Sequence, residues 1–429
     1  MGKMRKIHLI EWFKKPTMLR IIFLIIAQAF IALLFDVFGL GAGSIGSYTF
    51  LKYASIFSNA SAFIILLYPP LLSSDGGIGV LASHLGTSLH IGSIKPSLFK
   101  NTKNYWALMA GVLTLGVFNS LWIALISYIT NLATLGPSRV LNPLPFIVIP
   151  ILSLTMASLL SSQLTSLLAF FVFKRKLNPD ILVYPTMSTI NNILSTVFYA
   201  LLIFLFKPAN WFTTEGKWIR ISRGVYFGLI PVILYLTFVI VLVSKFSKNK
   251  RFRAILKQAI PIQSITLTIN SLTGGILSKA GSALTNYPGL FLIYPALIDT
   301  LGDEVSMVAN TTSTHLSMGS IVPTYHAFKD KDLWPNFIGV GVAGLLLHVI
   351  YGVLGSVFAG DFAHIGVVFG IALLINGFGF LLILFVIFSL IIFVFKKGLD
   401  PDNLSVPIIA SLSNLVVSTL LLLVSFVLT

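Results

Sequence analysis

Five acidic residues of this chain lie within or beside long apolar segments. They are Asp36, Asp75, Asp299, Asp303 and Glu304. An unpaired charge inside a bilayer costs roughly 2.5 to 3.5 kcal/mol on insertion scales, so such residues usually face a cavity or a partner. Carboxylate oxygens are the preferred ligands of hard divalent cations. We predict a cation-attracting role for Asp299, Asp303 and Glu304. For Asp75 a loop or helix-cap role is equally open, and Asp36 can instead be a single hydrogen-bonded acid.

Neutral oxygens accompany these acids. Asn192 and Asn414 lie on Ser/Thr-bearing faces of two apolar segments, and Ser188 is one turn before Asn192. Asn310 adds an amide in another polar turn. Hydrogen bonding between helices is the alternative role for such residues. The complete predicted set of metal-ligating residues is Asn192, Asn414, Asp299, Asp303, Glu304, Asp75, Asn310 and Ser188.

Other chemistries have weaker support. The chain has no cysteine, and neither His84 nor His315 has a second nitrogen or sulfur ligand nearby in sequence, so a transition-metal site is a weak prediction. The Gly-x-Gly-Asp element of intramembrane aspartyl proteases, the rhomboid Gly-x-Ser-Gly nucleophile and the phosphate-binding P-loop are all absent. We therefore expect neither an enzyme nor a resident cofactor.

The polar residues recur because part of the chain is duplicated. YPPLLSSDGGIGVLASHLGTSLHIGSI, from Tyr68, returns as YPALIDTLGDEVSMVANTTSTHLSMGSI, from Tyr294. A second pair of segments matches Pro179 with Pro401, Asp180 with Asp402, Pro185 with Pro407 and Asn192 with Asn414. Chance similarity between apolar segments would match Leu and Val rather than these residues. Two related halves, as in many membrane carriers, are therefore predicted.

Composition defines the class of protein. Hydrophobic residues make up 56% and charged residues 10% of the 429 residues. A soluble domain of this size could not bury so much apolar side chain, and several apolar runs are about 20 residues long, enough to cross a bilayer. The chain is predicted to be an all-α polytopic membrane protein. The expected helices are 18–40, 58–93 (broken near the repeated motif), 105–132, 145–173, 180–206, 224–244, 258–279, 287–320, 334–359, 363–395 and 403–428.

The net charge of +16 is explained by the orientation of the chain in the membrane. With a cytoplasmic N-terminus, most of the Lys and Arg residues fall in cytoplasmic segments, as the positive-inside bias requires, and they would contact anionic lipid headgroups. Nucleic-acid binding is not expected. An odd number of spans would place the C-terminus outside the cell membrane.

The helix between the halves decides their relative direction. Five spans alone would make the second half cross the membrane in the opposite direction, and a sixth span restores the original direction. The predicted fold class is therefore two parallel five-helix repeats plus one linking helix, about eleven spans in all, with a pseudo-twofold axis along the membrane normal. The predicted boundaries are 1–207 for the first repeat, 208–250 for the linker and 251–429 for the second repeat.

Two further predictions concern backbone and caps. Pro69, Pro70 and Gly76, like Pro295 and Gly302, are expected to interrupt apolar helices, and the freed carbonyls would face protein or water. Asp180 and Asp402 stand at helix starts, where capping is the expected role and ion attraction the alternative.

These segments resemble a known family. GDEVSMVANTTSTHLSMG and LASHLGTSLHIG are similar to the motif of MgtE-type magnesium transporters, closest to their two-repeat solute-carrier branch, and the PD(x)4P segments at Pro179 and Pro401 fit it as well. The resemblance implies a pore on the pseudo-twofold axis between the last helices of the two halves. In single-repeat relatives an Asp on that helix helps to bind hydrated Mg²⁺, and the matching positions here are Asn192 and Asn414.

The sequence thus predicts transport of a divalent cation, Mg²⁺ above others, through a path between the repeats. A monomer is possible because two repeats replace a homodimer. A small-molecule or lipid exporter on the same scaffold is the alternative, and an accessory membrane subunit without its own path is the third.

Overall fold

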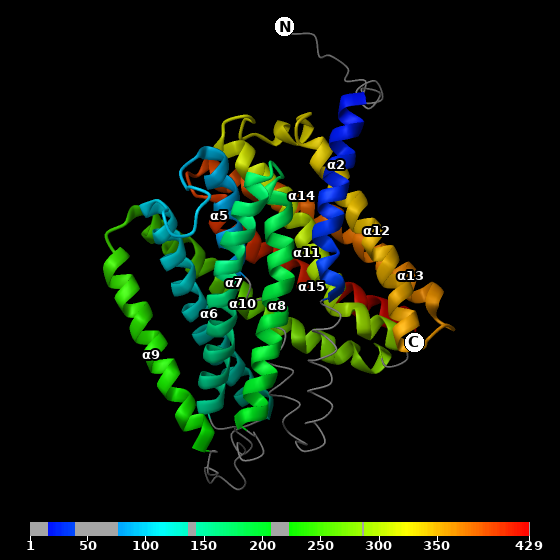
Figure 1. The fold of residues 1–429 in the computed structure, drawn as a ribbon. Helices are drawn as coiled ribbons and strands as arrows, with labels where there is room; N and C mark the ends of the chain where they lie inside the picture. The colour runs from blue at the N-terminus through cyan, green and yellow to red at the C-terminus, as the bar shows by residue number, and fades with distance from the viewer. Residues whose placement is uncertain (1–15, 39–75, 136–142, 207–222, 285–286, 429) are drawn as a thin grey trace.

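The computed structural model describes residues 16–38, 76–135, 143–206, 223–284 and 287–428, and the regular elements in these ranges are helices (Figure 1). Asp75, Pro69 and Pro70 lie outside the described residues. The first half has α2 (Pro16–Leu33), α5 (Gly76–Ile91), α6 (Lys103–Leu135), α7 (Pro143–Lys174) and α8 (Pro179–Phe206), followed by α9 (Arg223–Phe246). The second half has α10 (Lys250–Leu284), α11 (Pro288–Ser317), α12 (Trp334–Ala359), α13 (Ile365–Leu374), α14 (Phe380–Lys396) and α15 (Ser405–Leu428).

Three short elements complete the second half. They are the 3₁₀ turns η3 (Tyr325–Lys329) and η5 (Pro401–Asn403), and the π-helical segment η4 (Ile375–Gly379) between α13 and α14. The sequence predicted 363–395 as one uninterrupted α-helix and did not show this π segment. π segments within α-helices are often found at functional sites.

Eight helical stretches in the described part of the chain are long and apolar enough to cross a membrane. They are α2 with its extension to Phe38, α6, α7, α8, α9, α12, the α13–α14 stretch and α15. Of the other three expected spans, 258–279 and 287–320 are present as α10 and α11, with 35 and 30 residues, and only the second part of 58–93 is described, as α5 with 16 residues. Nearly every described residue of α5 and much of α11 are buried. Helices shielded from lipid by their neighbours tolerate polar residues such as the acids Asp299, Asp303 and Glu304 of α11.

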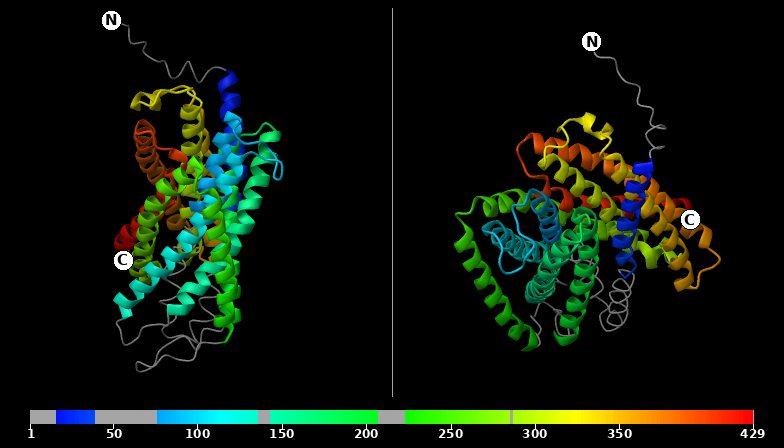
Figure 2. Two further views of the ribbon diagram at one scale, coloured as in Figure 1. Left: turned by 90° about the vertical axis from the view of Figure 1, so that its left-hand side faces the viewer. Right: turned by 45° about the horizontal axis from the view of Figure 1, so that its top comes forward.

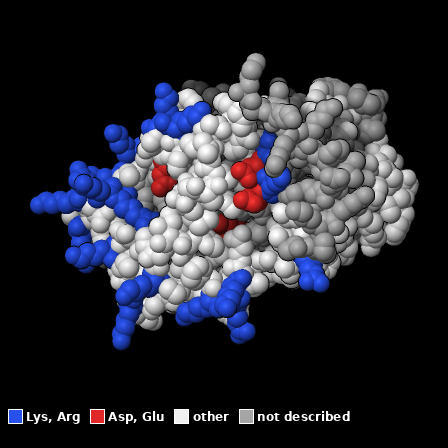
Figure 3. Space-filling view, turned by 90° about the horizontal axis from the view of Figure 1, so that it is seen from above, with Lys and Arg blue, Asp and Glu red and all other residues white. Residues whose placement is uncertain are grey.

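The chain reverses repeatedly at one end of the bundle, at the top of Figure 1. The connections α5–α6, α7–α8, α9–α10, α11–α12 and α14–α15 all lie there and carry Lys or Arg. We call it the basic end, and Figure 3, which looks onto it, shows Lys and Arg spread around its rim. Consequently α8 and α15 both start at the basic end, while α5 and α11 both finish there. The two halves run in the same direction, as predicted.

Contacts between equivalent residues locate the pseudo-twofold axis. Ser83 Oγ donates to Asn310 Oδ1 at 2.7 Å, and one turn further Thr87 Oγ1 and Thr314 Oγ1 are 3.1 Å apart. In each pair the two residues occupy the same position in the repeated motif. Equivalent residues of two copies meet each other only on the axis that relates them. Because both pairs progress in the same direction along α5 and α11, this axis runs along the bundle.

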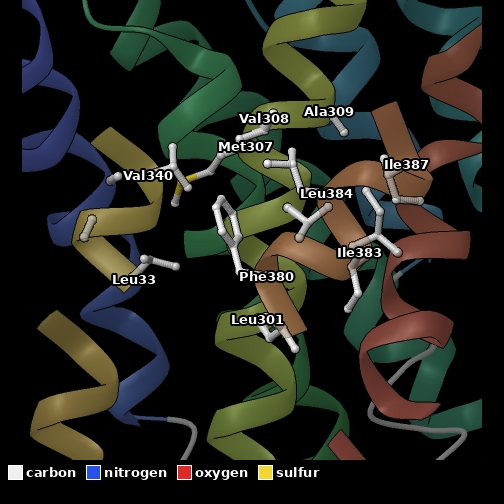
Figure 4. Close-up of a cluster of buried hydrophobic side chains, with 14 of the residues drawn as sticks. Leu33, Leu301, Met307, Val308, Ala309, Val340, Phe380, Ile383, Leu384 and Ile387 are labelled. Carbon is white, nitrogen blue, oxygen red and sulfur yellow. The ribbon is translucent and has the colours of Figure 1, made fainter. Parts of the chain in front are cut away.

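The first helix of each half packs against the other half. α2 lies along α12, and α10 lies along α6. Glycines allow both close approaches: a Cβ at Gly339 would lie 2.5 Å from Ile25 Cγ2, and one at Gly111 would lie 3.3 Å from Ile255 Cγ2. Figure 4 shows Leu33 of α2 in the buried cluster formed by α11, α12 and α14. Small residues at helix contacts are typical of membrane proteins, where backbones approach closely.

The linking helix α9 lies at the outer edge, as two further views also show (Figures 1 and 2). Tyr235 and Val239 pack on Val117 of α6, while Phe227, Ile233 and Leu234 are exposed. An exposed apolar face on a membrane helix is where lipid is expected.

The predicted interruption at Pro295 and Gly302 is wrong, because α11 continues through both residues. A proline removes a single helical hydrogen bond, and the packed neighbours of α11 keep the helix intact. Gly302 serves a contact instead, since a Cβ there would lie 3.4 Å from Ser413 Oγ of α15.

Candidate functional site

A fully buried carboxylate, Asp36, lies where the end of the first span meets α8 and α11. Thr189 Oγ1 donates to Asp36 Oδ1, and Thr300 Oγ1 donates to Asp36 Oδ2 at 2.9 Å. The Tyr351 hydroxyl is 2.9 Å from Thr300 Oγ1. Since the single Thr300 proton goes to Asp36, Tyr351 is the donor in that contact. Helices from both halves therefore hold this carboxylate, and Asp303 is within hydrogen-bonding reach of it.

Asn192 and Asp299 form a second group of oxygens nearby. Asn192 Nδ2 donates to Asp299 Oδ2 at 3.1 Å, joining α8 of the first half to α11 of the second. Asn192 is 1% exposed, and its Oδ1 has no hydrogen-bond partner among the described residues. A buried amide oxygen without a donor is costly. Beside a carboxylate, it is suited to coordinate a cation or a cation-bound water.

Glu304 occupies a separate buried position between α11, α12 and the π segment. Asn376 Nδ2 lies 2.9 Å from both Glu304 carboxylate oxygens, and His348 Nδ1 is 3.5 Å from Oε1. The π segment shifts the helical register and brings Asn376 to the carboxylate. The absence of a side chain at Gly344 leaves space for the Glu304 carboxyl group, which a Cβ at that position would overlap. His348 Nδ1 lies 2.9 Å from the Gly344 carbonyl oxygen, to which it donates, so its Nε2 carries the lone pair.

At the basic end, two equivalent carboxylates approach the axis. Asp402 Oδ1 accepts from Ser313 Oγ at 2.5 Å, and Asp180 packs against Gly86, the position equivalent to Ser313. Thr314 contacts Asp180, and Thr87 contacts Asp402. Burial raises the pKa of the Asp402 carboxyl, and the neighbouring Asp400 raises it further. Both side chains therefore face the interface between the halves.

The capping role predicted for Asp180 and Asp402 is wrong. The backbone N–H of Asp180 donates to Asn178 Oδ1 at 3.0 Å, and the N–H of Asp402 donates to Asp400 Oδ1 at 3.1 Å. The caps are the residues two positions earlier, which leaves the two aspartates free to point inward. The repeated Asx-Pro-Asp spacing was the available signal, because an Asx residue readily caps the N–H two residues on.

The described members of the predicted ligand set are all at least partly buried, and most lie at contacts between helices. Asn192 and Asp299 meet, Asp303 reaches Asp36, and Asn310 meets Ser83. Glu304 stands apart with Asn376, and Ser188 is buried on α8. Asn414 donates to Asn270 Oδ1 of α10 at 3.2 Å and does not share the partner of Asn192. Sequence reasoning did not select Asp36, Thr189, Thr300, Asp180 and Asp402 as ligands.

The last helices of the halves do not form the interface alone. α5 and α11 each pack against both α8 and α15. Asn192 and Asn414 therefore face different neighbours.

A duplicated helical bundle in the membrane, with carboxylate and amide oxygens collected between its halves, is a cation-transport architecture. The family model of the MgtE divalent cation transporters matches residues 68–202 and 294–424, more than half of the chain. The chain belongs to this family, and its function is divalent cation transport. The two matched regions confirm the predicted resemblance and coincide with the two copies found in the sequence. No curated protein and no solved structure matches significantly.

Proposed function

We propose that this chain carries Mg²⁺ across the membrane along the interface between its repeats, where α8 and α15 meet α5 and α11. The proposed path passes Asp180 and Asp402 at the basic end and then Asp36, Asp303 and the Asn192–Asp299 pair at depth. Asn414, Asn310, Ser188 and Glu304 are proposed as further oxygen donors beside it.

Buried negative charge without a fixed counter-ion carries this proposal. Asp36, Asp180, Glu304 and Asp402 are each at most 3% exposed. Among the described residues, no Lys or Arg lies within ion-pair distance of these four carboxylates. His84 and His348 are near two of them, and Arg251 acts on Asp402 from beyond that distance. A buried charge needs a partner, a proton or a metal ion. A cation that moves through the interface would supply the compensation transiently.

The donor set suits a hydrated ion. Mg²⁺ loses its waters reluctantly and is usually held by one or two carboxylates and several waters. Asp299 with the open Asn192 oxygen offers one such contact, and Asp36 offers another within the same layer. The hydroxyls and amides of Ser83, Asn310, Thr87 and Thr314 would contact the water shell. A membrane potential contributes about 4.6 kcal/mol per 100 mV for a divalent ion, at about 2.3 per charge.

Orientation and assembly complete the proposal. The positive-inside bias assigns the basic end to the cytoplasm, where its Lys and Arg residues would contact anionic lipid headgroups. The N-terminus would then be cytoplasmic and the C-terminus outside the cell membrane. Because both repeats reside in one chain and meet on the axis, a monomer is sufficient for the path.

Flux in proteoliposomes tests the path. The protein is reconstituted with a Mg²⁺-sensitive dye inside the vesicles, and uptake is driven by an imposed potential. Asp299→Asn and the double change Asn192→Leu with Asn414→Leu are each expected to reduce the initial rate on the order of 100-fold, since they remove oxygens from the proposed path. Asp332→Asn, at an exposed acid of the α11–α12 connection, is the matched control and is expected to keep the full rate.

Unchanged Mg²⁺ uptake in both path variants would overturn the proposed route. Substrate-driven proton movement without divalent flux would instead support the exporter alternative, and the absence of any flux in the native protein would support the accessory role.

A further inference from the structure

A histidine of the first repeat meets two carboxylates of the second repeat at the basic end. His84, on α5, lies with its Nδ1 3.9 Å from Asp400 Oδ2 and 3.9 Å from Asp402 Oδ2. The three atoms lie within 4.8 Å of one another. His84 and Asp402 are buried, whereas Asp400 is partly exposed and opens the group to the surface.

Each of the three side chains is anchored by its other polar atom. His84 Nε2 is 2.8 Å from Asn403 Oδ1, and Asn403 in turn donates to Gln258 Oε1 at 2.9 Å. Asp402 Oδ1 accepts from Ser313 Oγ, and Asp400 Oδ1 accepts from the backbone N–H of Asp402. The atoms left over, one nitrogen and two oxygens, all turn toward a common point. A metal-binding histidine typically donates its second ring N–H to an oxygen in this way.

The hydrogen bonds also define the tautomer of His84. Asn403 Oδ1 is an acceptor, so Nε2 carries the proton. Arg251 Nη2 approaches His84 Nδ1 at 3.4 Å and donates to Ser88 Oγ at 2.6 Å. Because a guanidinium is a donor only, Nδ1 presents its lone pair. A lone pair that faces two carboxylates is repulsive unless a cation lies among them, and here Arg251 supplies the positive charge.

We propose that His84, Asp400 and Asp402 bind one divalent transition-metal ion such as Zn²⁺, Co²⁺ or Mn²⁺, and that Arg251 neutralises the same group when no metal is bound. Imidazole nitrogen favours these ions over Mg²⁺, which prefers oxygen. Bonds of about 2.1 Å at a tetrahedral angle separate two ligand atoms by roughly 3.4 Å. Each 3.9 Å gap must therefore close by about 0.5 Å, and water can complete the coordination from the exposed side of Asp400.

The site would join the two repeats. His84 belongs to the first repeat, whereas Asp400 and Asp402 belong to the second, so a bound ion would link α5 to η5 across the interface. The site shares Asp402 with the basic end of the proposed Mg²⁺ path but does not include the oxygens at depth, which are those of Asp36, Asp303 and the Asn192–Asp299 pair, and it is tested by binding alone. A failure of the flux experiment would leave it unaffected.

Cobalt absorption provides the test. Purified full-length protein is titrated with Co²⁺ in excess Mg²⁺, and the visible d–d bands report coordination. The native protein is expected to bind one Co²⁺ per chain. His84→Asn is expected to weaken binding at least tenfold, and Asn403→Leu, which releases the ring, by about 10- to 100-fold. His326→Asn, at an exposed histidine of η3, is the matched control and keeps the native affinity.

Arg251→Gln separates a site from general damage. Removing the competing guanidinium is expected to increase the affinity for Co²⁺, a gain that a misfolded protein would not produce. The inference is overturned if His84→Asn binds Co²⁺ as tightly as the native protein, if Mg²⁺ displaces Co²⁺ at equal concentration, or if Arg251→Gln binds more weakly.

Discussion

The two repeats are alike at the basic end and different at depth. At the basic end, Gln28 Oε1 accepts from the N–H of Asn178, and Gln258 Oε1 accepts from the N–H of Asp400, at 3.1 Å in both copies. Eight residues further along the same helices, Asp36 stands in the first copy where Thr266 stands in the second. Thr189 donates to the Asp36 carboxylate, and its equivalent Ser411 donates to the backbone carbonyl of Thr266.

This difference shows where the duplicated scaffold has specialised. The matching caps and axis contacts hold the two halves in register, and both copies need them. At depth the described acids lie on one side of the axis, around α11, and the end of the first span, just after α2, contributes Asp36 from the first half. Among the residues that the structure describes, the polar interface therefore has a single acidic side, whereas an equal pair of sites would require a carboxylate at residue 266.

The largest expected effect comes from making the two copies alike at depth. Asp36→Thr gives the first repeat the residue of the second and removes the carboxylate held by Thr189 and Thr300. We expect the Mg²⁺ flux to fall on the order of 100-fold, because the buried negative charge that would attract the ion is gone. The measurement is the initial uptake rate in proteoliposomes.

Thr266→Asp is the reciprocal change and sharpens the comparison. If Mg²⁺ flux depends on where the carboxylate lies rather than only on its presence, the double variant Asp36→Thr with Thr266→Asp will show the same low flux as Asp36→Thr alone. Restoration would mean that the two sides of the axis are interchangeable.

The second effect concerns the two glycine contacts between the repeats. Gly339→Ala places a methyl group against Ile25, and overpacking of this kind costs about 1 to 3 kcal/mol. Gly111→Ala meets Ile255 at an easier distance and gains about 1 kcal/mol of helix propensity, so its net effect is expected near zero. Thermal unfolding in detergent measures both, and equal melting temperatures would contradict the structural difference.

The smallest effect is expected at the glutamines. Gln28→Ala loses one hydrogen bond to another segment, from the Asn178 N–H, worth about 1 kcal/mol, and an exposed contact from its Nε2 to the Leu24 carbonyl oxygen of its own helix. Gln258→Ala loses two, because Gln258 Oε1 accepts from both Asp400 N–H and Asn403 Nδ2. We expect the lower melting temperature for Gln258→Ala, and the reverse order would count against the contacts described here.

Much of the architecture could be predicted from residues alone. Long apolar runs with few charges can satisfy their backbones only as membrane helices, and matching Pro, Asp and Asn residues revealed the two copies. The parallel direction of the repeats followed from the extra apolar run between them. The resemblance of the repeated motif to the magnesium transporters was confirmed by the family match.

The features that were predicted wrongly or not at all have a common cause: packing between helices decides which local structure a sequence motif adopts. Pro295 and Gly302 signalled a break, but neighbours on every side of α11 hold it as one helix. Asp180 and Asp402 signalled caps, but the preceding Asn178 and Asp400 take that role. The π segment at Asn376 had no signal in composition, because Glu304 lies 72 residues away in the chain.

The sequence by itself determined that this protein is a doubled helical bundle in a membrane, with acids and amides too costly to place in lipid. Hydropathy, charge bias and internal repetition act locally along the chain, so they can be read without coordinates. Only the tertiary structure decided that α2 and α10 cross to the opposite halves, that Asp36 joins Thr300, and that His84 meets Asp400 and Asp402. Those contacts depend on how side chains far apart in sequence fill the same space.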